Sequence, residues 1–167
     1  MTALARLYDG VIGGLAALAG VIVAAMVVLI VVDVAMRNLG LEPPAGTIAL
    51  TEYALLYFTM AAAPWLTRRR GHVTVLIVLD RLRPEARRRA AVVVALMCGA
   101  IALALSILSG TLMAESLMLG DVEPRSIDTP RWLLFLPMMI GLFFTATEFL
   151  RAVLRGEDVT AGQVEKM

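Results

Sequence analysis

Four long apolar segments, nearly free of charge, dominate this sequence of 167 residues. They span approximately residues 10–34, 48–67, 88–119 and 131–151. About 20 helical residues are enough to cross a hydrocarbon core of about 30 Å, because a helix rises about 1.5 Å per residue. Hydrophobic residues make up 60% of the chain, whereas soluble globular chains contain about 45–50%. We therefore expect an all-α integral membrane protein with four transmembrane helices, folded as a single membrane domain over residues 1–167.

The basic residues are distributed unevenly among the connectors. The connector 68–89 holds eight arginines, namely Arg68, Arg69, Arg70, Arg81, Arg83, Arg87, Arg88 and Arg89. With Arg6 near the N-terminus and Arg151, Arg155 and Lys166 near the C-terminus, where residues 152–167 form a short polar tail, it accounts for twelve of the fifteen Lys and Arg residues. The other two connectors carry three: Arg37, Arg125 and Arg131. Short loops rich in Lys and Arg are retained in the cytoplasm. The pattern predicts cytoplasmic termini and makes the connector a cytoplasmic interface anchor.

Apolar residues inside the basic connector follow a helical spacing. Val75, Leu76, Leu79 and Leu82 recur on one side of a helix, while charged residues take the other positions. We expect a short amphipathic helix within 71–83 that lies flat at the membrane surface, with an irregular basic loop as the alternative. Pro84 suits the first position of the third transmembrane helix, because its missing N–H has no helical partner there.

The ends of the apolar segments carry residues typical of membrane interfaces and helix starts. Trp65 and Trp132 are expected at the headgroup level, where tryptophan is enriched. Thr129 suits the N-cap of the fourth helix, with Pro130 in its first position. These features predict that the fourth helix begins next to the outer membrane surface.

No catalytic, cofactor-binding or metal-binding pattern is found in the sequence. Cys98 is the single cysteine and His72 the single histidine, so neither a disulfide nor a zinc site of Cys and His can be built. Glycine-rich nucleotide motifs, GxSxG and HExxH are absent. The basic cluster lacks interleaved aromatic residues, which argues against nucleic-acid binding. We expect neither an enzyme nor a cofactor in this chain.

Four main ionisable residues lie within or beside the apolar segments, where a charge is costly without a partner. Arg37 ends the first segment and Glu52 begins the second, so we expect them to form a structural ion pair near the outer face. The functional alternative is that Glu52 binds a proton or a sodium ion. Glu115 and Glu148 are interpreted as charges at the membrane boundaries.

Small residues recur at helical spacing on two segments and predict helix contact faces, because small side chains let membrane helices approach closely. One face consists of Gly13, Ala17, Gly20 and Ala24, and the other of Ala95, Gly99, Ala102 and Ser106. The two faces serve either packing within this chain or contact with a partner, and the sequence leaves both open.

The order of these features resembles a known family. The first segment ends in Arg37, a loop with Pro and Gly follows, and Glu52 lies early in the second segment. The likeness continues with Gly71-His72-Val73-Thr74-Val75 between arginine-rich flanks, and ends with Pro130, Trp132, Pro137 and Gly141. In this order the chain resembles the small membrane subunit of tripartite ATP-independent periplasmic (TRAP) transporters, the DctQ-like family.

This resemblance implies a secondary active transporter in the bacterial inner membrane. In that family the small subunit braces a large multi-span permease subunit, which carries the substrate and sodium sites. A soluble periplasmic solute-binding protein delivers an organic acid such as a C4-dicarboxylate or sialic acid. The implied partners of this chain are therefore the large subunit, the binding protein and membrane lipids.

Two other classes compete with this interpretation. The first is a self-sufficient small four-span proton-coupled transporter that uses Glu52. The second is a membrane-bound enzyme or cytochrome subunit, and here the single histidine rules out haem held by two histidines.

Overall fold

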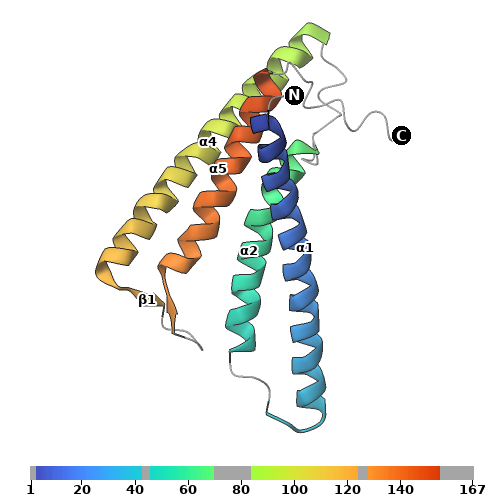
Figure 1. The fold of residues 1–167 in the computed structure, drawn as a ribbon, viewed down its shortest axis with the longest axis vertical. Helices are drawn as coiled ribbons and strands as arrows, with labels where there is room; N and C mark the ends of the chain where they lie inside the picture. The colour runs from blue at the N-terminus through green and yellow to red at the C-terminus, as the bar shows by residue number, and fades with distance from the viewer. Residues whose placement is uncertain (1–2, 43–45, 70–83, 124–127, 155–167) are drawn as a thin grey trace.

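The computed structural model describes residues 3–42, 46–69, 84–123 and 128–154. Within them the chain forms four long helices: α1 (Ala3–Asn38), α2 (Thr47–Arg68), α4 (Pro84–Leu119) and α5 (Trp132–Leu154). Two strands, β1 (Val122–Glu123) and β2 (Thr129–Pro130), lie between α4 and α5 (Figure 1). The helical content agrees with the predicted all-α class.

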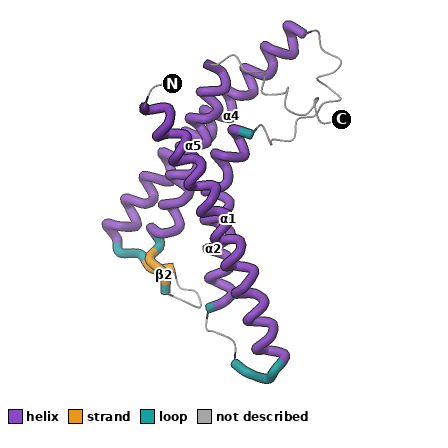
Figure 2. Tube along the Cα trace, turned by 45° about the vertical axis from the view of Figure 1, so that its right-hand side comes forward, coloured by secondary structure: helices purple, strands orange, loops and turns teal. Residues whose placement is uncertain are grey.

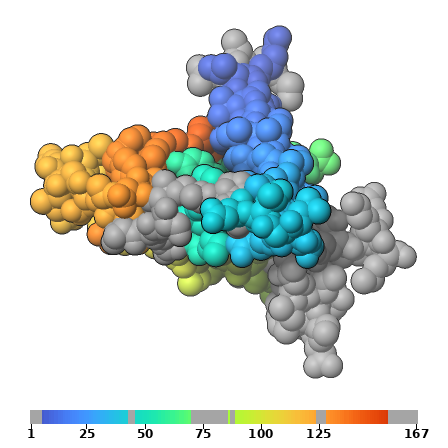
Figure 3. All heavy atoms as spheres, turned by 90° about the horizontal axis from the view of Figure 1, so that it is seen from below, coloured from blue at the N-terminus to red at the C-terminus, as the bar shows by residue number. Residues whose placement is uncertain are grey.

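The helices are arranged in a row, in which α4 packs on α5, α5 on α2, and α2 on α1. The start of α1, the end of α2, the start of α4 and the end of α5 gather at one end of the molecule, which we call the arginine end. Toward the opposite end, the loop end, the pair α1 and α2 diverges from the pair α4 and α5 (Figures 1 and 2). Figure 3 looks onto this loop end, with the end of α4 on the left and the end of α1 on the right. The contact between α2 and α5 therefore joins the two helix pairs.

Three of the described helices are long and apolar enough to cross a membrane. These stretches are Arg6–Asn38, Arg89–Leu119 and Trp132–Leu154. In α1 only 6% of the most apolar stretch is buried within the chain, compared with 33% in α5. Exposed apolar surface on this scale requires lipid or a partner protein. The fourth span, which corresponds to α2, stays a prediction.

The sequence predicts the starts of two helices, and the structure confirms one of these predictions and contradicts the other. α4 begins at Pro84, which confirms that prediction. The prediction for Thr129 and Pro130 is wrong, because both residues form β2 and α5 begins at Trp132. β2 pairs antiparallel with β1, and the N–H of Arg131 donates to the carbonyl of Asp121 at 3.0 Å. The backbone pairing of this small hairpin replaces the expected helix cap.

The predicted interfacial helix within 71–83 lies outside the described residues, as does the polar tail after Leu154.

Candidate functional site

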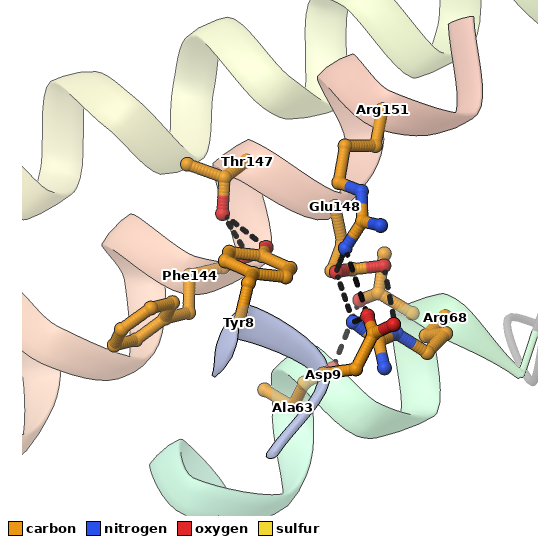
Figure 4. A network of polar contacts seen from close by, with 9 residues as sticks. Tyr8, Asp9, Ala63, Arg68, Phe144, Thr147, Glu148 and Arg151 are labelled. Atoms are coloured by element: carbon orange, nitrogen blue, oxygen red, sulfur yellow. Dashed lines mark hydrogen bonds and ion pairs between the residues drawn. The ribbon is translucent and has the colours of Figure 1, made fainter. Parts of the chain in front are cut away.

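Charged side chains from three helices meet at the arginine end and form what we call the charge network (Figure 4). Arg68 comes from the end of α2, and Glu148 and Arg151 come from the last turns of α5. Arg68 contacts Glu148 at two points, with 3.0 Å from Nη2 to Oε1 and 3.2 Å from Nε to Oε2. Nη1 of Arg151 lies 3.4 Å from the same Oε1. Glu148 is only 6% exposed, so two guanidinium groups neutralise a buried carboxylate.

Asp9 of α1 completes the charge network. Its Oδ1 lies 2.9 Å from Nη2 of Arg68 and 3.2 Å from Nη1 of Arg151. The two carboxylates and the two guanidinium groups thus alternate around the cluster. A buried charge is costly unless it is paired and hydrogen-bonded, and this arrangement pairs each acid with two arginines. The charge network therefore fixes α1, α2 and α5 relative to one another.

Tyr8 reinforces the contact between α1 and α5. Thr147 donates its hydroxyl proton to the carbonyl of Phe144 at 2.8 Å, so the hydroxyl of Tyr8 donates to Oγ1 of Thr147 at 2.7 Å. The Tyr8 ring faces the guanidinium of Arg151, with 4.5 Å from Cζ to the ring centroid. The ring also contacts Phe144, with 6.0 Å between centroids. A cation over an aromatic face is attracted by the ring quadrupole, so this tyrosine supports the charge network.

The charge network has a structural role. The hydrogen bond to Glu148 raises the pKa of the Arg68 guanidinium above its ordinary value, although partial burial acts in the opposite direction. Arg68 is therefore permanently charged at physiological pH and does not exchange protons. Among the described residues, no group of three or more His, Cys, Asp or Glu side chains is placed to hold a metal ion. The arrangement can hold helices together.

The predicted pair of Arg37 and Glu52 lies at the loop end. Arg37 donates from Nε to Oδ2 of Asp33 at 2.8 Å, one turn earlier on α1. Glu52 is exposed near the start of α2. The structure thus places Arg37 against Asp33, and pairing with Glu52 stays a prediction.

The two predicted contact faces have different surroundings. On α4, Ala95 and Ala102 are buried, and Ser106 donates to the carbonyl of Met139 of α5 at 2.8 Å. A Cβ atom on Gly99 would lie 3.3 Å from Cβ of Phe149, also in α5. The face on α4 therefore packs within the chain. On α1, all four residues of the predicted face are exposed: Gly13, Ala17, Gly20 and Ala24.

The structure describes some of the residues that are predicted to lie at the membrane interface. The guanidinium of Arg69 lies over the ring of Trp65, with 4.9 Å from Cζ to the ring centroid, and both side chains are exposed. Trp132 is half-buried at the start of α5, and Arg89 is exposed on α4. Among the other connector arginines, Arg70, Arg81 and Arg83 lie outside the described residues, and only the backbone is described for Arg87 and Arg88.

The sequence pattern does not predict the charge network. It predicts Arg68 as an interface anchor and Glu148 as a boundary charge, and it does not single out Tyr8 or Asp9. The available signal was topological. Two acids, Asp9 and Glu148, lie at segment ends that the cation count places on the same side as Arg68.

The chain was compared with known proteins. A family model described as the DctQ component of tripartite ATP-independent periplasmic transporters matches residues 26–158, from the middle of α1 to beyond α5. A search of the curated proteins finds no match. The family consists of transporter components and not of enzymes, and together with the apolar helices it indicates a multi-pass inner-membrane protein. Because the match covers most of the sequence, this chain belongs to the DctQ family, the small permease subunit of TRAP transporters.

Proposed function

We propose that this chain braces the large permease subunit of a sodium-coupled, binding-protein-dependent TRAP transporter that imports an organic acid such as a C4-dicarboxylate or sialic acid. In this proposal the substrate and sodium sites belong to the large subunit. The observation that carries the bracing role is the charge network. Its buried carboxylate, Glu148, is held between Arg68 and Arg151. A fully paired carboxylate suits a fixed scaffold better than an ion pathway.

The proposal includes the membrane topology. α2 lies between α1 and α5, each of which is long and apolar enough to span a membrane. A helix packed between two spanning helices is most simply a span itself, so α2 is the fourth. The arginine end faces the cytoplasm, because that side carries the basic connector and the positive-inside bias applies to it. Arg69, stacked on the exposed ring of Trp65, is placed to contact lipid headgroups.

The open face of α1 is the surface that we assign to the large subunit. The small residues of α4 are already used against α5, whereas Gly13 and Gly20 of α1 have open space where a Cβ would lie. Glycine within a helix costs about 0.5–1 kcal/mol relative to alanine. Close packing by a helix of the large subunit would offset this cost.

Reconstitution tests the proposed function. The tagged chain is co-expressed with the large membrane subunit and the binding protein of its transporter, and the purified proteins are placed in liposomes. We expect the chain to co-purify with the large subunit. Uptake of radiolabelled C4-dicarboxylate or sialic acid should require the chain, the large subunit, the binding protein and a sodium gradient.

Liposomes that contain the chain alone are the control. Solute transport by the chain alone, abolished by Glu52→Gln, would overturn the proposal in favour of a self-sufficient transporter. Failure of the large subunit to co-purify would overturn the bracing role.

A further inference from the structure

The contact between α2 and α5 joins the two helix pairs, and each of these helices contains an internal proline, Pro64 in α2 and Pro137 in α5. Proline has no N–H, so it cannot donate to the carbonyl four residues earlier in a helix. The carbonyls that lose their partner are those of Met60 and Leu133. An unsatisfied backbone carbonyl is costly in a packed or lipid environment.

The carbonyl of Leu133 receives a replacement donor from the other helix. The hydroxyl of Tyr57 in α2 donates to this oxygen at 2.8 Å. Tyr57 therefore supplies across the helix contact the hydrogen bond that Pro137 removes within α5. This bond constrains the relative height and rotation of the two helices.

The carbonyl of Met60 faces the other helix at its closest approach. At Gly141 of α5, a Cβ atom would meet the Met60 oxygen and would lie 2.8 Å from the Met60 Cβ. Any side chain at Gly141 would collide with α2, so glycine is required for this approach. The carbonyl released by Pro64 thus packs directly on the backbone of α5.

One apolar groove between α1, α2 and α5, with a volume of about 130 Å³, is lined by four of these residues: Tyr57, Met60, Pro137 and Gly141. Its other lining residues are Leu15, Leu18, Ala61, Leu136 and Ile140. Among all the lining side chains, Tyr57 alone carries a hydrogen-bond donor. Without its hydroxyl, the groove offers no other side-chain partner for the Leu133 carbonyl.

We propose that these two contacts form a conformational lock. In each helix, the carbonyl that has lost its hydrogen-bond partner to a proline contacts the other helix. The lock fixes the crossing of α2 and α5 near the middle of α2, while the charge network fixes the arginine end. The two helix pairs are thereby held as one rigid body although they diverge at the loop end. In this lock Tyr57 is a positioning residue. The lock lies within this chain, so its test is independent of the proposed function.

A double-mutant cycle tests the lock on the full chain in detergent or nanodiscs. Tyr57→Phe should lower the melting temperature by about 1–4 °C, because the Leu133 carbonyl is left without a donor. Pro137→Ala restores the N–H at position 137. In that background Tyr57→Phe should therefore have little effect. The same loss of stability in both backgrounds would overturn the assignment of Tyr57.

Distances between spin labels give a second readout. In a Cys98→Ser background, labels at Leu55 of α2 and Leu112 of α4 report on the separation of the two helix pairs, and labels at Val28 and Leu50 report within one pair. Tyr57→Phe should broaden the distance distribution of the first pair and leave the second unchanged. Adding Pro137→Ala should leave this distribution broad, because the double variant still lacks the bond from Tyr57 to the Leu133 carbonyl. A first-pair distribution that is already broad in the unchanged chain would show that the lock does not exist.

Discussion

Arg68 at the end of α2 and Glu148 in α5 form a two-point ion pair between residues 80 positions apart in the chain, with contacts of 3.0 and 3.2 Å. Arg–carboxylate pairs with two parallel hydrogen bonds are stronger and more directional than single contacts. Because α2 and α5 belong to different helix pairs, this bond joins the two halves of the molecule at the arginine end.

Arg68→Gln should destabilise the chain far more than Arg69→Gln. The first change leaves the buried Glu148 with Arg151 alone, and losing one partner of a buried charge pair costs about 3–5 kcal/mol when burial is complete. Arg68 remains partly exposed, so about 1–3 kcal/mol is expected. Arg69 is the matched control, since it is the adjacent arginine and stacks on exposed Trp65. Thermal unfolding in mild detergent measures both, and equal losses would contradict the structural role of Arg68.

Exchanging the charges of Arg68 and Glu148 should fail to restore stability. In an isolated ion pair the double change Arg68→Glu with Glu148→Arg keeps the attraction. Here the new carboxylate at position 68 would face Asp9, and the new guanidinium at position 148 would face Arg151. Both new neighbours carry the same sign of charge as the introduced group. A double variant as stable as the unchanged chain would show that the pair acts alone, outside an alternating cluster.

Arg68 should contribute the same stability at every pH from about 6 to 9. Its pKa in the folded chain is raised, chiefly by the hydrogen bond to Glu148. A cation with a raised pKa contributes its full stabilisation at every pH below its ordinary pKa, which for arginine lies far above this range, and loses it only at still higher pH. The melting-temperature difference between Arg68→Gln and the unchanged chain, measured across this range, should be constant. A difference that falls as the pH rises toward 9 would contradict a permanently charged Arg68.

The sequence predicts α1, α4 and α5 well, because a long run of uncharged apolar residues in lipid satisfies its backbone only as a helix. The charge network was not predictable in the same way. Pairing between Asp9, Arg68 and Glu148 depends on which helices are neighbours and on their rotation, and neither follows from hydropathy. The prediction for Thr129 and Pro130 failed for a similar reason. These residues pair with β1 through the backbone instead of capping α5, and this pairing does not follow from local capping preferences.

A comparison of two double-mutant cycles should identify the partner of Arg37. The structure places its guanidinium on Asp33, whereas the sequence pattern predicts Glu52. We expect Arg37→Ala to be non-additive with Asp33→Ala and nearly additive with Glu52→Ala, because coupling energies arise between side chains in contact. Thermal unfolding of the five variants measures both couplings. Stronger coupling to Glu52 than to Asp33 would support the sequence prediction instead.

Gly13→Leu should impair assembly with the large subunit, whereas Gly14→Leu should not. Both glycines are exposed on α1 with open space around them, and adjacent helical positions point about 100° apart, so only Gly13 lies on the small-residue face. Each change replaces a helical glycine and should stabilise the isolated chain by about 0.5–1 kcal/mol, which separates an assembly defect from misfolding. Co-purification of the large subunit with the tagged chain is the measurement. If the two variants retain the large subunit equally, its contact lies on another face, and the exposed glycines of α1 face lipid.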